Sequence, residues 1–286
     1  MLSAALALLL AAQTPNAAAS RSPIVVTAQP VDRQTVHRYV SEVSQTVNGQ
    51  LARLRHPVCP EVLGMPLVPG ARIAARIRQV ATEAGLRVGA MGCRPNVSVF
   101  FVENGQTFVR DLRRRDASIF AGISPVDLRR VLAEGEPARA WRLVQTQNED
   151  GVVEGMRGVH RVAVRGGAFS TVRSSSVVNL SARQVVTNAV VVIERDAAIG
   201  KTLTQLADYA AMVALAGARP PADGAPPADT ILSLFSAGAP APARLTRLDF
   251  EYLAAIYRLP PDRRATHQMA QMSEHIAAAL RTERRD

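Results

Sequence analysis

The sequence has little of several residue types that particular functions require. Of its 34 basic residues only Lys201 is a lysine, and aromatic residues make up 4% of the 286 positions. Basic runs such as Arg113–Arg115 therefore lack the interleaved aromatic rings on which nucleic-acid bases stack. Acidic residues flank these runs, which is typical of a solvated surface. The sequence therefore predicts no nucleic-acid partner. The net charge of +10 could instead bind an anionic lipid surface.

Motifs for metal binding and for serine nucleophiles are missing as well. There is no HExxH and no histidine pair at i and i+4, and His267 and His275 lie two turns apart on a polar segment. No serine stands in a GxSxG pattern, and Ser174–Ser176 has no neighbouring histidine. We therefore expect no metal site and no cofactor.

The chain has only two cysteines, Cys59 and Cys93, at neither CxxC nor metal-binding spacing. In an exported chain an even, minimal count predicts one disulfide between them. The alternative is a cysteine nucleophile that works with His37, His56 or His160. Both cysteines lie in proline-containing turns rather than at a helix N-terminus that would lower a thiol pKa, so the disulfide is favoured.

Residues 1–19 are typical of a secretory signal peptide. Leu2–Ala12 is an apolar run of signal-peptide length, and Ala17–Ala19 offers small residues for cleavage. No basic residue stands between Met1 and the apolar run, so a short anchor or a misassigned start codon explains the pattern equally well. No later run reaches the ~18 apolar residues of a membrane span. The sequence predicts a periplasmic or secreted protein with no transmembrane helix in the mature chain.

The strongest structural signal is the stretch Val185–Gly217. Val185–Ile193 is a β-branched run that predicts a buried strand. Leu203–Gly217 has apolar residues at the i, i+3, i+4, i+7 spacing of a core-facing helix. Lys201 follows a glycine between the two, where a phosphate-binding loop would be, but Arg195 occupies a position that requires glycine. We expect no nucleotide site there.

The start and the polar face of this helix carry the candidate site residues. Thr202 and Gln205 have the spacing of a capping box, in which each side chain bonds the other residue's backbone N–H. The face away from the core is expected to show Gln205, Asp208, Tyr209 and Met212. These side chains could line a pocket with Asp208 as an acid or base, but the more economical interpretation is the polar surface of an amphipathic helix.

The remaining elements predict an α+β fold, with a mixed sheet packed by helices on one side and closed by C-terminal helices. Further strands are expected at Val97–Val102, Ala138–Thr146 and Val159–Val164. Further helices are expected at Val31–Leu54, Ala71–Ala84, Ser124–Ala133, Thr246–Leu259 and Arg264–Arg285. We assign residues 20–56 to an N-terminal extension and helix, residues 57–286 to a single α+β domain, and residues 218–229 to a Pro/Gly-rich surface loop.

Several short segments resemble known families. TLTQLADYAAMVALA, DTILSLF and LTRLDFEYLAAIY follow one another in the order seen in exported bacterial proteins with a zincin-like core derived from metalloproteases. HPVCPEVLG, GCRPNVSVFFV and QLADYAAM are similar to an uncharacterised secreted family of Gram-negative bacteria. The resemblance implies export and a zincin-like topology, with Gln205 and Asp208 in place of the family's polar helix pair. No histidine stands at a ligand position, so the resemblance argues against zinc-dependent proteolysis.

These observations favour a non-catalytic binding protein of the periplasm or envelope. On this hypothesis Gln205, Asp208 and Met212 line a relict zincin cleft that binds a peptide, a cell-wall component or an anionic envelope component. The alternative is a metal-independent hydrolase that uses Asp208 and Tyr209.

Overall fold

The computed structural model describes residues 31–120, 122–148, 180–220, 228–236 and 241–282. The chain from Val31 onward forms one compact unit. The predicted signal peptide, the predicted strand Val159–Val164 and residues 221–227 of the predicted loop lie outside the described residues. None of the described helices combines the length and the hydropathy that a membrane span needs.

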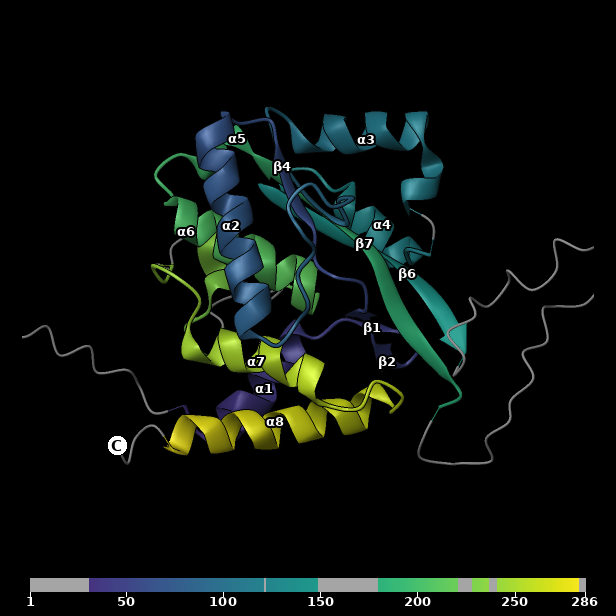
Figure 1. Cartoon of the computed structure of the whole chain (residues 1–286), viewed down its shortest axis with the longest axis vertical. Coiled ribbons are helices and arrows are strands. Elements are labelled where there is room, and N and C mark those ends of the chain that lie inside the picture. Colours follow the sequence, from purple (N-terminus) through teal and green to yellow (C-terminus); the bar gives the residue numbers. More distant parts are fainter. Residues whose placement is uncertain (1–30, 121, 149–179, 221–227, 237–240, 283–286) are drawn as a thin grey trace, which may run out of the picture. The chain divides into compact units, whose positions relative to one another are not determined.

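The centre of the fold is a mostly parallel sheet built on β7 (Ala182–Glu194) (Figure 1). β6 (Ala138–Asn148) pairs with β7 in antiparallel fashion along its whole length. A strand has two edges, so β3 (Arg53–Leu54) and β5 (Val97–Val102) follow one another along the other edge, both parallel to β7. β4 (Pro60–Leu63) pairs parallel to β5 and forms the far edge. The mixture of helices and this sheet agrees with the predicted α+β class.

Both faces of the sheet carry a hydrophobic core. Successive residues of a strand point to opposite faces, so Val99, Phe101 and Val191 enter a larger core while Phe100 and Val192 enter a smaller one. The prediction of helices on one side only is therefore wrong. Its physical reason is visible in the run VSVFFV, because a strand buried on both faces has a nearly continuous apolar sequence rather than an alternating one.

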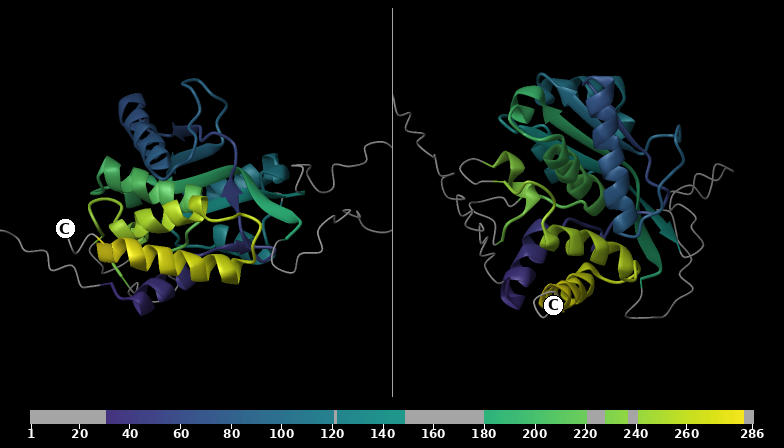
Figure 2. Two further views of the ribbon diagram at one scale, coloured as in Figure 1. Left: turned by 60° about the horizontal axis from the view of Figure 1, so that its bottom comes forward. Right: turned by 60° about the vertical axis from the view of Figure 1, so that its left-hand side comes forward.

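Different helices cover the two cores. The larger core is covered by α1 (Arg33–Val43), α2 (Leu67–Glu83), α6 (Leu203–Ala211), the π-helix η2 (Met212–Ala216), the 3₁₀ helix η3 (Ile231–Phe235), α7 (Arg247–Arg258) and α8 (Ala265–Thr282). The smaller core is covered by α3 (Gly105–Arg115), the 3₁₀ helix η1 (Ala117–Phe120) and α4 (Pro125–Val131). A short α5 (Arg195–Ala198) follows β7. α1, α7 and α8 lie together at one end of the unit (Figure 2).

The predicted helix Val31–Leu54 is wrong in its second half. α1 ends at Val43, and a two-stranded hairpin of β1 (Thr46–Val47) and β2 (Gln50–Leu51) follows. Asn48 and Gly49 form the turn, and both have positive φ, 48° and 73°. An Asn-Gly pair is the strongest short-range hairpin signal because a type I′ turn needs positive φ at both central positions. This local signal outweighs the helical periodicity.

Several local predictions are confirmed. The disulfide joins Cys59 and Cys93, with 6.0 Å between their Cα atoms. The side chain of Ser124 caps α4 by accepting a hydrogen bond from the N–H of Asp127. Thr202 and Gln205 form the predicted capping box of α6. The two caps depend on residues that are close in sequence. The disulfide could be predicted because the chain has only two cysteines, so each has one possible partner.

Candidate functional site: an arginine-lined pocket

Asp208, the central residue of the predicted site, is buried in an ion pair. The guanidinium of Arg76 on α2 donates from Nε to Oδ1 at 2.7 Å and from Nη2 to Oδ2 at 3.1 Å. The backbone N–H of Leu245 donates to Oδ2 at 2.7 Å. Asp208 has no exposed surface, so the expected polar surface at this position is absent. In this arrangement the carboxylate ties α6 to α2 and to the start of α7.

The other predicted residues of the helix do not join Asp208 in one pocket. Gln205 completes the capping box and donates to the carbonyl oxygen of Pro242 at 2.9 Å. Met212 lies fully inside the larger core. Tyr209 packs edge-on against Phe235, with 4.8 Å between ring centroids. These positions neither confirm nor contradict a role in binding, which remains a prediction.

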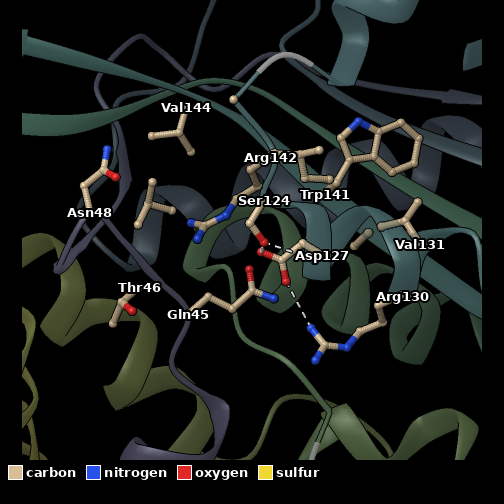
Figure 3. Close-up of a pocket in the computed structure, with 14 residues that line it drawn as sticks. Gln45, Thr46, Asn48, Ser124, Asp127, Arg130, Val131, Trp141, Arg142 and Val144 are labelled. Atoms are coloured by element: carbon tan, nitrogen blue, oxygen red, sulfur yellow. Dashed lines mark hydrogen bonds and ion pairs between the residues drawn. The ribbon is translucent and has the colours of Figure 1, made fainter.

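A pocket with both polar and apolar lining lies elsewhere, between the outer edge of β6, α4 and the β1–β2 hairpin (Figure 3). It encloses about 300 Å³. Arg142 of β6 and Asp127 of α4 face its middle, while Thr46 and Asn48 form the opposite wall (Figure 3). We call it the Arg142 pocket.

Arg142 is the unusual residue of this pocket. Its side chain is buried, with 8% of the residue exposed. Among the described residues its only hydrogen-bond acceptor is the carbonyl oxygen of Ala52, 3.1 Å from Nη1, and no carboxylate there lies within ion-pair distance. Burial lowers the pKa of Arg142, but an arginine side chain stays protonated in proteins. The pocket therefore contains a buried cation that forms no ion pair with a described residue, although the charge of Asp127 acts on it.

Gly217 makes room for this cation. It ends η2 in the left-handed conformation, with φ of 62°. A Cβ at this position would overlap the guanidinium of Arg142, so the close approach requires glycine. The guanidinium thus lies at the C-terminal end of the helix, where the partial negative charge of the helix dipole offsets part of its charge.

A second arginine cluster borders the pocket around Asp127. The carboxylate of Asp127 accepts from Arg130 at 3.1 Å and from the hydroxyl of Ser124 at 2.8 Å, and it also pairs with Arg219. Burial lowers the pKa of Arg219. Together with Arg142, this gives three arginines and one carboxylate in and beside the pocket. The net charge of the group is therefore positive.

A second cavity, of about 500 Å³, lies next to the Arg142 pocket. The two share four lining residues, namely Gln45, Arg130, Val131 and Ala140. Tyr209, Leu232 and Phe235 give the second cavity an apolar wall. Burial, and secondarily the charge of Glu136, raises the pKa of Tyr209, so its hydroxyl stays neutral. A neutral phenol in an apolar wall is suited to packing and to hydrogen bonding rather than to base catalysis.

The chemistry available at the Arg142 pocket is binding. Ser124 donates to Asp127 and caps α4, but no histidine lines the pocket to activate its hydroxyl. Among the described residues no three His, Cys, Asp or Glu side chains are placed to hold a metal ion. What remains is a set of N–H donors and one buried cation, which can hold an anionic group in place.

Sequence reasoning missed Arg142, although a signal was present. The predicted strand Ala138–Thr146 is otherwise apolar around Arg139 and Arg142. An arginine inside a buried strand requires a counterion, a helix end or a ligand. Arg139 has the first of these, Glu194 at 3.0 Å, and only the structure shows that Arg142 does not.

Comparison with known proteins gives no further guide, since no family model, no curated protein and no solved structure matches the chain.

Proposed function

We propose that the protein is a non-catalytic binding protein of the cell envelope, and that the Arg142 pocket holds the carboxylate of a peptide or cell-wall component. The observation that carries this proposal is the buried guanidinium of Arg142, which faces a pocket and has no carboxylate partner among the described residues. Leaving a buried charge unpaired is costly. A ligand carboxylate would supply the missing counterion.

A carboxylate suits this pocket in charge and in shape. The planar guanidinium matches a carboxylate with two parallel N–H···O bonds. A volume of about 300 Å³ is at the lower end of the range of small-molecule sites, so it accommodates the end of a chain rather than a folded partner. The adjoining cavity with Tyr209 and Phe235 then receives the apolar side chain next to that end.

The test compares short peptides that have a free C-terminal carboxylate with the same peptides as C-terminal amides. Isothermal titration should show binding of the free acids and, since a hydrogen bond to a charged group contributes about 1.5–3 kcal/mol, a roughly 10- to 100-fold weaker affinity for the amides. Arg142→Met should abolish this difference. Arg130→Met is the matched control, because it removes a bordering cation already paired with Asp127. Equal affinity for acids and amides would refute the proposal.

The export of the protein is part of the same proposal. A disulfide between Cys59 and Cys93 and the lack of a membrane-spanning helix among the described residues are compatible with a periplasmic or secreted location. Fractionation of cells that produce the full chain, with mass determination of the mature N-terminus, tests both the location and the predicted cleavage after Ala19. Recovery in the cytoplasm with the cysteines reduced would contradict it.

A zincin-like ancestry also remains a proposal. It is supported by the order of α6, η3 and α7, which is the order of the three segments that carry the resemblance. If the fold is a relict of this kind, the purified protein should contain no stoichiometric zinc, and chelators should leave its stability unchanged. Metal analysis and thermal unfolding with and without a chelator decide this.

The alternative of a metal-independent hydrolase has no observation in its favour. Both carboxylate oxygens of Asp208 accept hydrogen bonds from Arg76 or Leu245, and the raised pKa of Tyr209 is the opposite of what a nucleophile needs. Turnover of a peptide library that Asp208→Asn or Tyr209→Phe eliminates would revive it.

A further inference from the structure

A group of exposed apolar side chains lies outside the Arg142 pocket, at the carboxyl ends of the parallel strands. Large hydrophobic side chains are exposed at six of the described positions, and four of these belong to this group. The four are Leu63, which ends β4, Leu67 and Val68, which begin α2, and Ile199, which follows α5. We call this group the end patch.

A shallow cavity of about 620 Å³ lies between the turns that carry the end patch, and Ile199 is the member of the patch that lines it. Its lining includes Gly64–Pro66 from the β4–α2 turn and Ala198 and Ile199 from the turn after α5, so the two turns are neighbours. Arg195 bridges them by donating to the carbonyl oxygen of Gly64 at 3.2 Å. Figure 1 shows the end of β4, the start of α2 and α5 together at one end of the unit. The floor is apolar, with Phe101 and Leu206.

The side chains of the end patch project from the tips of these turns. Leu67 is 86% exposed and Ile199 is 76% exposed. Leucine and isoleucine projecting this far gain nothing from the fold itself, since burial is what stabilises an apolar side chain. Exposed apolar side chains that gather on neighbouring turns in this way indicate a surface that contacts a partner or a membrane.

The charges around the end patch favour a membrane over a protein partner. Lys201 lines the cavity and Arg72 lies exposed on the second turn of α2, and neither forms an ion pair with another described residue. Arg195 is paired with Glu103 at 3.4 Å, and α5 contains one acid, Asp196. Apolar tips flanked by cations are complementary to a surface of anionic headgroups over hydrocarbon.

We propose that the end patch docks the protein on an anionic phospholipid surface. Leu67, Val68 and Ile199 enter the boundary between headgroups and acyl chains, while Lys201 and Arg72 contact lipid phosphates. This inference is independent of the proposed function, because the Arg142 pocket and the end patch share no residues.

Vesicle flotation tests this proposal with the full chain. Vesicles of phosphatidylglycerol mixed with phosphatidylcholine should carry the protein at low ionic strength, and pure phosphatidylcholine vesicles should carry far less. Leu67→Asp and Ile199→Asp should each lower the bound fraction by roughly tenfold, and Lys201→Glu should lower it less and weaken its salt dependence. Thermal unfolding midpoints confirm that each variant is folded.

Met91→Asp is the matched control, because Met91 is 87% exposed but belongs to neither of the two turns that carry the end patch. All variants share the apolar Leu2–Ala12 segment, so any binding by that segment is the same in each. Equal binding by Leu67→Asp, Met91→Asp and the wild type would overturn the proposal, as would no binding by the wild type. Sedimentation velocity tests whether the end patch instead binds a second copy of the chain. A wild-type dimer that Leu67→Asp dissociates, together with no binding to vesicles, would also overturn the proposal.

Discussion

Asp208 and Arg142 are both buried charges, but they are buried in different ways. Asp208 is surrounded by donors: the Arg76 guanidinium and the Leu245 N–H take up both of its oxygens. Arg142 has one carbonyl oxygen as an acceptor among the described residues, and it faces a pocket. The carboxylate of Asp208 is fully hydrogen-bonded within the fold, whereas the guanidinium of Arg142 is not.

This difference separates a structural tie from a binding group. A buried ion pair stabilises the fold mainly in the sense that breaking it is expensive. A buried cation that forms no ion pair instead lowers the stability of the fold. Such a loss of stability is common at sites where function requires it. Sequence pattern favoured Asp208 as the site residue, whereas the surroundings of the two charges favour Arg142.

The largest effect is expected where the fold makes room for Arg142. Gly217→Ala should cost about 3–4 kcal/mol of unfolding free energy, because it adds a left-handed alanine and an overlap with the guanidinium. In an Arg142→Ala background the overlap is gone, and the cost should fall to the left-handed penalty of about 1–2 kcal/mol. Urea unfolding of the four proteins measures this coupling. An unchanged cost in the double variant would show that Arg142 does not press on Gly217.

Removing the structural tie should come next. Asp208→Ala leaves the Arg76 guanidinium and the Leu245 N–H without their acceptor, at an expected cost of about 2–4 kcal/mol. The lower end allows for the 24% exposure of the Arg76 side chain. Asp111→Ala serves as the control, since it breaks an exposed pair with Arg114 and should cost less than about 0.5 kcal/mol. Similar urea midpoints for the two variants would contradict the assignment of Asp208 as a tie.

The predictable part of the fold was the part with local causes. The strand Val97–Val102 has the predicted bounds, and α4 begins after Ser124 as expected, because cap, proline and acid lie within four residues. The error in the predicted helix Val31–Leu54 also has a local cause. The prediction followed the helical periodicity of the apolar residues and gave too little weight to the turn signal of Asn48 and Gly49.

The candidate site could not be predicted in the same way, because its partners are distant in sequence. Arg76 and Asp208 are 132 positions apart, and Arg76 on its own helix is an ordinary polar residue. Whether Arg142 has a counterion depends on what the chain folding around it supplies, and a pattern along β6 does not contain that information. The sequence could flag the arginine but could not distinguish it from Arg139.

A third buried acid, Asp249, forms no ion pair with another described residue, and it should give the fold a pH dependence. It accepts hydrogen bonds from Tyr39 at 2.7 Å, Thr230 at 2.5 Å, and the N–H groups of Ile231 and Thr246. Burial outweighs these bonds and raises the pKa of Asp249 above its ordinary 3.8. The folded state then holds the proton to higher pH than the unfolded state. The free energy of unfolding should therefore fall as the pH rises from 3.8 through the raised pKa.

Urea unfolding of the wild type and Asp249→Asn across the acid range measures this effect, which is about 1.4 kcal/mol for each unit of separation between the two pKa values. The stability of the wild type relative to Asp249→Asn should decrease as the pH rises through that window. Asp111→Asn, which removes a partly exposed acid, is the matched control for the loss of one carboxyl group. A relative stability that increases with pH would mean that the hydrogen bonds outweigh burial and that the pKa is lowered.

The smallest effect on stability is expected for the residue with the largest expected role in binding. Arg142→Met removes a buried charge, which favours the fold, and leaves the Ala52 carbonyl without its donor, which costs about 1 kcal/mol. These effects oppose each other, so the free energy of unfolding should change by less than about 1 kcal/mol, whereas carboxylate binding should be lost. A loss of stability as large as that of Asp208→Ala would mean that Arg142 is a second structural tie, with its charge satisfied by the end of η2. If Arg142→Met is as stable as the wild type but no longer binds the carboxylate, the role of Arg142 is ligand binding rather than stabilisation of the fold.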